Sequence, residues 1–160
     1  MDKNESMIEY LVQCPSIGDK SLFFNYAEGE DDTNHFVTQA TDKATQKPYV
    51  DGSVEKRYSF TLISYKSIGY RAVDSSDIAS DENLDELSDV QAIIDWIASQ
   101  SESELYPNFG DDCQIDDMFC TTDKPVLLGI IGDAQGNPIA RYSITIQIDY
   151  LDTSKMIWKN

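Results

Sequence analysis

Carboxylates dominate the side chains of this chain that are able to do chemistry. Its 160 residues include 29 Asp and Glu against 12 Lys and Arg. Doublets such as Asp111-Asp112 and Asp116-Asp117 offer the oxygen ligands that calcium prefers, but none follows the alternating pattern of a calcium loop with a central Gly and a final Glu. So many acids also produce chance carboxylate pairs, and sequence spacing alone selects none of them for acid–base catalysis. We therefore expect solvated acidic loops and no metal site.

Histidine and cysteine offer little further chemistry. His35 is the single histidine, which excludes metal sites that need two imidazoles, and no Cys or Ser partner stands near it in the sequence. Cys113 and Cys120 are separated by six residues instead of the two of a zinc-binding pair. With Cys14 the thiols number three, which suits free, buried cysteines in a reducing compartment.

The common catalytic motifs are missing from the sequence. It has no Gly-rich phosphate loop ending in Lys-Ser or Lys-Thr, no G-x-G-x-x-G and no G-x-S-x-G. We therefore expect no catalytic residues, no cofactor and no enzymatic activity. A small enzyme without a recognisable motif remains the alternative.

The negative charge is concentrated in one part of the chain. Residues 72–123 hold 15 acids and no Lys or Arg, whereas the rest sums to −2, which together give the net charge of −17. This charge disfavours binding to bare nucleic acid or to an anionic membrane. The longest apolar stretch, residues 126–131, is too short to cross a bilayer, and the first residues lack the pattern of a signal peptide. We expect a soluble protein that is not secreted.

Two helices are expected to position these residues. Apolar residues recur at helical spacing in residues 5–13 behind Asn4, and Pro15 blocks continuation of that helix. A second, longer helix is predicted from Asn83, because Leu87, Val90, Ile94 and Ile97 form one apolar stripe and Glu86 completes a capping box. Acids in its first turns are favoured by the helix dipole.

Strands are predicted for residues 21–27, 35–40, 54–65, 114–121, 126–131 and 139–150, with a turn at Asp51-Gly52 and a hairpin loop at 132–138. The last strand alternates most clearly, with Tyr142, Ile144, Ile146, Ile148 and Tyr150 on one face. The expected fold class is α+β: a mostly antiparallel sheet packed against one long helix, with a short N-terminal helix. Residues 1–150 form a single domain and residues 151–160 a C-terminal tail.

Several motifs in order carry a family resemblance. The segments MIEYLVQCPSI, YVDGSVEKRYSF, IIDWIASQ with ELYPNFG, and ARYSITIQIDY together resemble the small siphophage tail proteins of the tail terminator or tail completion type, often labelled minor capsid proteins. The resemblance spans residues 7–150. The acidic stretch 74–84 is longer than in that family, Leu105-Tyr106-Pro107 stands where Leu-Pro is usual, and residues 151–160 have no counterpart.

The resemblance implies a virion structural protein at the head–tail interface, present in the host cytoplasm during assembly. Its subunits form a hexameric ring on the head-proximal end of the tail tube, stop tube polymerisation and join the tail to the head connector. The implied partners are other copies of the chain, the tail tube protein and the head–tail connector protein, with no membrane and no specific nucleic acid. The alternatives are a head completion or stopper protein of the same junction and an acidic DNA mimic that inhibits a DNA-binding protein.

Electrostatics suggest roles for two sets of residues within such a ring. Six copies at −17 carry −102, and a ring of that charge repels DNA passing through it. We expect acids of residues 72–123 to face the lumen, namely Asp85, Glu86, Asp89, Asp111, Asp112, Asp116 and Asp117. We expect cations to meet acids of the neighbouring subunit, namely Lys56, Arg57, Arg71 and Arg141. For Arg57 and Arg141 an ordinary solvated strand face is an equal alternative.

Overall fold

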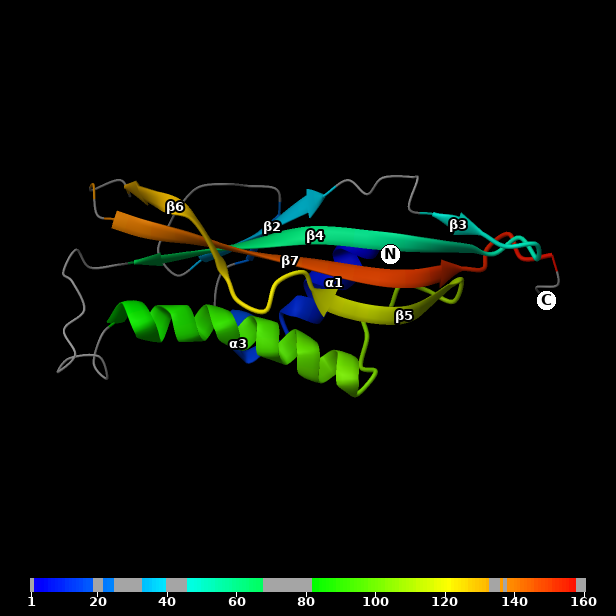
Figure 1. Cartoon of the computed structure of the whole chain (residues 1–160), viewed down its shortest axis with the longest axis horizontal. Helices are drawn as coiled ribbons and strands as arrows, with labels where there is room; N and C mark the ends of the chain where they lie inside the picture. Colours follow the sequence, from blue (N-terminus) through cyan, green and yellow to red (C-terminus); the bar gives the residue numbers. More distant parts are fainter. Residues whose placement is uncertain are drawn as a thin grey trace.

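The fold is built on two long strands, β4 (Val54–Ser67) and β7 (Pro138–Asp152), which pair antiparallel from Val54–Asp152 to Ser67–Ile139. In this computed structural model the described residues are 2–18, 22–24, 33–39, 46–67, 82–132, 136 and 138–157. Figure 1 shows the two strands running along the longest axis of the molecule. All other described strands are arranged around this pair.

Shorter strands complete a seven-stranded sheet within the described residues, in the order β1-β2-β4-β7-β5. On the β4 side, β2 (Thr33–Gln39) and β3 (Lys47–Pro48) pair antiparallel with β4, and β1 (Leu22–Phe24) pairs parallel with β2. On the other side, β5 (Cys113–Cys120) and β6 (Val126–Gly132) pair antiparallel with the two halves of β7.

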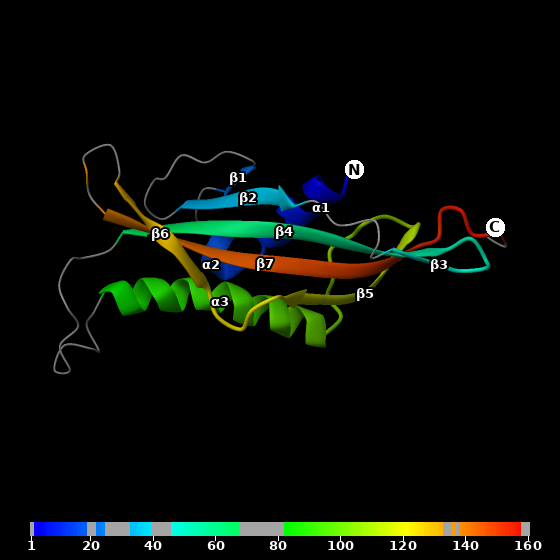
Figure 2. The ribbon, with the colours of Figure 1, turned by 45° about the horizontal axis from the view of Figure 1, so that its top comes forward.

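One face of the sheet carries the hydrophobic core beneath the helices α1 (Lys3–Leu11), α2 (Pro15–Gly18) and α3 (Glu82–Glu102). Phe60 of β4 stacks on Phe36 of β2, with ring centroids 4.5 Å apart. The turned view shows α3 extending below the sheet in the general direction of β4 and β7, with its C-terminal part beside one end of β5 (Figure 2). The buried core includes Met7, Leu11, Ile17, Leu62, Val90, Ile93, Ile97, Met118, Ile144, Ile146 and Ile148.

The predicted fold class is confirmed, because the sheet is mostly antiparallel and packs against helices. The predicted long helix appears as α3, which begins at Glu82, one residue before Asn83. The alternation predicted for the last strand is also confirmed, since Ile144, Ile146 and Ile148 are buried. The helical layer contains more than one long and one short helix, because α2 contributes Ile17 to the core.

Local details at the N-terminus differ from the prediction. Helix α1 begins at Lys3 and is capped by Asp2, whose Oδ1 accepts the backbone N–H of Glu5 at 2.8 Å. Asn4, the expected start, instead accepts a 2.6 Å hydrogen bond from the Tyr58 hydroxyl. Helix α1 ends at Leu11 and does not continue past Pro15, as predicted. Pro15 begins the separate helix α2, which agrees with the preference of proline for the first turn of a helix.

The Asp51-Gly52 turn lies where it was expected, between β3 and β4. Oδ1 of Asp51 accepts hydrogen bonds from the backbone N–H and the hydroxyl of Ser53, at 2.9 and 2.6 Å. The backbone N–H of Ile157 donates to the oxygen of Asp51 at 2.6 Å, which attaches the C-terminal segment to this turn. Among the described residues, no helix is long and apolar enough to cross a membrane.

Candidate interaction surfaces

Two of the predicted interface cations, Lys56 and Arg57, form ion pairs within the chain. The β4–β7 register sets Arg57 opposite Asp149, whose carboxylate accepts from Nε at 2.7 Å and from a terminal nitrogen at 3.1 Å. Nζ of Lys56 lies 2.8 Å from Oδ2 of Asp152. Hydrogen bonds from Lys56 and Ser154 hold the pKa of the Asp152 carboxyl well below its usual range. That these cations meet a neighbouring subunit stays a prediction, and such contacts would compete with the pairs seen here.

Arg141 differs from the other predicted cations that the structure describes. Its side chain has no hydrogen bond or ion pair with the described residues, and its Nε is buried. The guanidinium lies beside Gly129 of β6, where an added Cβ would be 3.6 Å from a terminal nitrogen. Burying a charged donor without a partner is unfavourable, so this guanidinium would gain from a carboxylate brought by another molecule. Arg71 lies outside the described residues.

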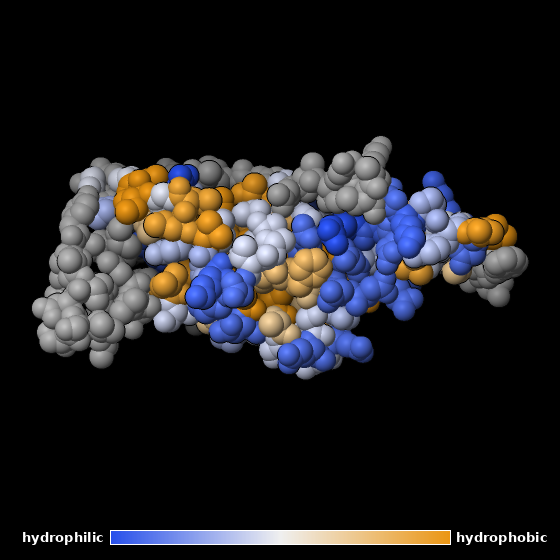
Figure 3. Space-filling view, viewed as in Figure 1, coloured by the Kyte–Doolittle hydropathy of each residue, from blue (hydrophilic) through white to orange (hydrophobic). Residues whose placement is uncertain are grey.

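Strand β6 exposes an apolar surface next to Arg141. Val126, Leu127, Leu128 and Ile130 are 44%, 53%, 48% and 57% exposed. One edge of β6 pairs with β7, and no described strand pairs with its other edge. Figure 3 shows this surface as an orange area at the upper left, over β6. Exposed apolar edge strands promote association with other chains, so β6 is a candidate interface.

Four of the acids predicted to line a lumen gather around β5. Asp111 and Asp112 precede the strand and Asp116 and Asp117 lie within it, and all four are exposed. The β5–β7 register shifts between Ile115 and Asp117, so Asp116 lies at a bulge. Partial desolvation of its carboxyl by the surrounding chain, together with the nearby charges of Glu55 and Asp149, raises the pKa of Asp116 from its ordinary value.

The remaining predicted acids lie elsewhere. Asp89 lies in the N-terminal half of α3 and forms a 2.8 Å ion pair with Nζ of the buried Lys66 of β4. Its side chain therefore takes part in the contact between the helix and the sheet. The backbone of Asp85 and Glu86 lies in the first turns of α3, while their side chains fall outside the described part. The exposed acids around β5 therefore form a cluster that does not include Asp89.

A groove of about 560 Å³ separates α3 from β5, and sequence reasoning did not find it. Its apolar lining includes Ile94 and Ala98 of α3 and Met118, Phe119 and Cys120 of β5. The acids that line this α3–β5 groove are Asp95, Glu102, Asp117 and Asp123. Asp95, Ala98 and Glu102 share one helical face at spacings of three and four, which was the available sequence signal.

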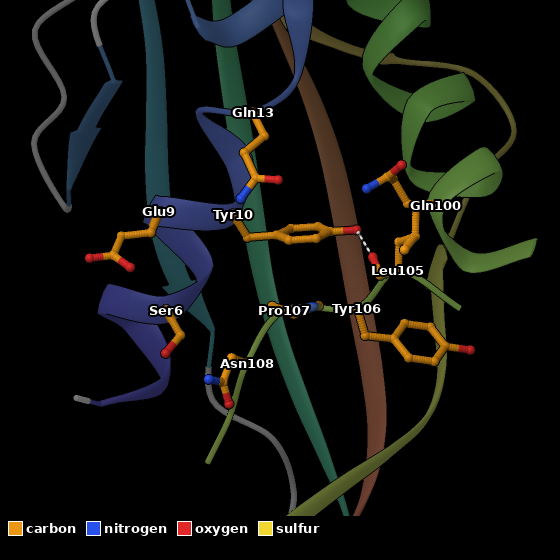
Figure 4. A pocket seen from close by; sticks show the side chains of 9 residues that line it. All are labelled: Ser6, Glu9, Tyr10, Gln13, Gln100, Leu105, Tyr106, Pro107 and Asn108. Atoms are coloured by element: carbon orange, nitrogen blue, oxygen red, sulfur yellow. Dashed lines mark hydrogen bonds between the residues drawn. The ribbon is translucent and has the colours of Figure 1, made fainter. Parts of the chain in front are cut away.

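A second pocket, of about 400 Å³, lies between the N-terminal helix α1 and the segment that follows α3 (Figure 4). Tyr10 of α1 donates a 2.5 Å hydrogen bond from its hydroxyl to the backbone oxygen of Leu105. Burial raises the pKa of Tyr10 to about 12, so this hydroxyl keeps its proton at neutral pH. Two segments of the resemblance, MIEYLVQCPSI and ELYPNFG, meet at this hydrogen bond, which gives the pocket a structural role.

The surroundings of the histidine and the cysteines are those of residues that stabilise the fold. His35 is buried, 3.1 Å from Oγ1 of Thr33 and edge-on to the Tyr65 ring. The three cysteines are free, and burial raises the pKa of Cys14 and brings that of Cys120 to about 12, which disfavours the reactive thiolate. Within the described residues, no group of three or more His, Cys, Asp or Glu side chains is arranged to hold a metal ion.

Comparison with known proteins identifies no family for this chain. No protein-family model matches it, and no curated protein sequence matches it at a significant level. Function must therefore be inferred from the residues and their geometry.

Proposed function

We propose that this chain is a structural subunit of a bacteriophage virion. It forms a ring, of six copies, on the head-proximal end of the tail tube, where it terminates tube polymerisation and joins the tail to the head connector. The proposed subunit has no enzymatic activity, no cofactor and no specific site for nucleic acid. The order of motifs that resembles tail terminator proteins supports the proposal, and so does the α+β fold which that resemblance implies.

The exposed apolar strand β6 is the observation that carries the proposal. A domain with a net charge of −17 has no need of four large apolar side chains in solvent along a sheet edge that no described strand pairs. Covering them with another protein removes apolar area from water and lets the backbone groups on the edge that no described strand pairs form hydrogen bonds. Such a surface fits a protein that acts by assembly.

Arg141 supports the same interface. Its buried Nε has no partner among the described residues and lies next to the apolar strand. A carboxylate from a neighbouring subunit would restore the missing interaction, and exposed acids are abundant in every copy. The acids around β5 add a second property, because a ring that carries −102 repels DNA from its wall and permits passage without sticking.

The experiment is a mass measurement of the purified protein with and without tail tubes, followed by electron microscopy of the tube ends. We expect a hexameric mass on the tubes and density at one end of each tube. Leu128→Lys on β6 should abolish the ring, because it places a charge in the proposed interface. Val50→Lys is the matched control, since Val50 is 96% exposed and lies away from β6 in the β3–β4 turn.

Two results would contradict the proposal. A strict monomer that ignores tubes argues against any ring on the tail, and a ring that forms equally well with Leu128→Lys argues against the β6 interface. Electron microscopy of intact particles separates a terminator from a head completion or stopper protein, because the latter would appear on the head side of the junction.

The exposed acids around β5 are also compatible with the alternative of a DNA mimic. A DNA mimic would bind a nuclease or a repressor tightly and lose that affinity as salt is added. Such binding, together with indifference to tail tubes, would favour the mimic.

A further inference from the structure

We propose that the α3–β5 groove binds an extended cationic segment of a partner protein, which adds a strand to the open edge of β5. The inference goes beyond the ring and rests on the groove alone. It names a second contact surface, at the opposite half of β7 from β6.

The groove has the size and the apolar floor that a docked side chain requires. Its volume of about 560 Å³ lies within the usual range of binding pockets, about 300–1,000 Å³. Met118 and Ile94 form the buried part of the floor, while Phe119 and Cys120 are partly accessible. Because the Cys120 thiol stays protonated at neutral pH, it adds to the apolar surface. In Figure 3, orange and pale orange atoms lie between two blue groups in the middle of this face.

The acids on the rim of the groove favour a bound segment that carries positive charge. None of the four lining acids forms an ion pair with a described residue. Asp117 accepts a 2.9 Å hydrogen bond from the backbone N–H of Met118 and a long 3.5 Å bond from Ser101. Asp95 accepts a 3.2 Å bond from Gln91, and all three donors are neutral. The nearest cation along the chain is Lys124, and residues 72–123 contain none. A segment that carries Lys or Arg complements this rim, whereas a second copy of the chain would bring another −17 to it.

The backbone of β5 supplies the direction of binding. One edge of β5 pairs with β7, and beyond the other edge no described strand follows. Figures 1 and 2 show β5 as the edge strand nearest α3. An added strand would gain main-chain hydrogen bonds from this edge and would send alternate side chains into the groove. The bulge at Asp116 interrupts the regular register, so pairing is expected along residues 117–120. There an added strand would replace the 2.9 Å hydrogen bond that the backbone N–H of Met118 donates to Oδ1 of Asp117.

The experiment uses the intact chain and a fluorescein-labelled peptide of alternating Lys and Val, with binding followed by fluorescence anisotropy. We expect the peptide to bind, and a peptide of alternating Glu and Val not to bind. The triple variant Asp95→Asn, Glu102→Gln, Asp117→Asn should weaken binding about tenfold or more, because it removes charge from the rim. The triple variant Glu9→Gln, Glu104→Gln, Asp111→Asn is the matched control, which changes the net charge equally outside the groove and should retain the affinity of the natural chain.

A steric variant separates the groove from general charge attraction. Ala98→Trp keeps every charge and fills the groove, so it should also weaken binding about tenfold. Hydrogen exchange should slow at residues 117–120 when the peptide is bound, and thermal melting of each variant should verify folding.

Three outcomes would overturn the inference: equal loss of affinity in the two triple variants, full affinity with Ala98→Trp, or absence of peptide binding. These measurements need no tail tubes. A failure here therefore leaves the ring proposal standing, and a failure of the ring leaves the groove to be judged by its own result.

Discussion

Lys66 is the most deeply buried cation that the structure describes, at 2% side-chain exposure, and its Nζ lies 2.8 Å from Asp89. Asp89 is 34% exposed, so it can be hydrated if its partner is removed, whereas Lys66 cannot. Removing one partner of an ion pair is most costly when the charge that remains is buried. The two residues are therefore unequal in their effect on stability.

We predict that Asp89→Asn lowers the free energy of unfolding by about 1–3 kcal/mol, because it removes the negative charge 2.8 Å from a buried ammonium. Lys66→Met keeps the length of the side chain and removes the charge, so it should cost less than Asp89→Asn. Urea denaturation at neutral pH measures both variants. A larger loss with Lys66→Met would show that the ammonium makes a net favourable contribution of its own.

Asp152 makes the free energy of unfolding depend on pH in the acidic range. Lys56 holds its pKa below the ordinary value, so the folded state binds a proton less readily than the unfolded state. The stabilisation is therefore complete above the unfolded carboxyl pKa, about 3.9, and is lost as pH falls below it.

We predict that Asp152→Asn lowers the free energy of unfolding by about 0.5–1 kcal/mol at neutral pH and by less at pH 3, because the pair is partly solvated. Urea unfolding at several pH values measures this difference. Asp111→Asn is the control, since Asp111 is exposed and forms no ion pair with the described residues. A deficit for Asp152→Asn that is the same at both pH values would contradict the linkage.

At the scale of elements, the turn between β3 and β4 is held against the C-terminal segment. Gly52 has a φ of +90°, and a Cβ there would overlap the backbone oxygen of Lys155. Gly110 also has a positive φ, of +101°, but an added Cβ there would meet no atom within 4 Å. The two glycines share the backbone strain that alanine would suffer and differ in the steric overlap.

We predict that Gly52→Ala destabilises by about 2–4 kcal/mol and Gly110→Ala by about 1–2 kcal/mol, because only the first adds an overlap to the strain of a positive φ. Thermal unfolding gives both values, and hydrogen exchange should show faster opening at residues 49–53 in Gly52→Ala. Equal losses in the two variants would mean that the C-terminal segment moves away without cost.

The sequence predicts best those helices and strands whose own residues show a periodic pattern of apolar and polar side chains. The alternation in β4 and β7 and the apolar stripe of α3 follow from local pattern, so their positions were predicted closely. β3 has two residues and no pattern to read. The pairing of Arg57 with Asp149 depends on register across 92 positions, and the α3–β5 groove depends on how a helix and a strand pack. Such contacts cannot be derived from local spacing.

At the scale of the whole molecule, the net charge of −17 acts on the folded state as mutual repulsion. The ion pairs at Asp89, Asp149 and Asp152 offset part of it, while acids such as Asp95, Asp111 and Glu102 form no ion pair with described residues. Salt screens exposed charges more than buried ones.

We predict that raising NaCl from about 0.02 M to about 0.5 M increases the midpoint of thermal unfolding by several degrees, because screening relieves the repulsion more than it weakens the partly buried pairs. Scanning calorimetry measures the shift. The control is the triple variant Asp95→Asn, Glu102→Gln, Asp117→Asn, which should respond less to salt. A midpoint that falls with salt would mean that the ion pairs outweigh the repulsion.

The ladder between β4 and β7 also fixes how the molecule responds to force. With about 3.3 Å per residue, the 14-residue β4 spans about 45 Å. The hydrogen bonds of an antiparallel pair lie perpendicular to the strands, so tension that pulls the two strands lengthwise past each other shears the whole ladder together instead of opening it bond by bond. The long axis in Figure 1 is therefore the direction in which the domain resists extension most strongly.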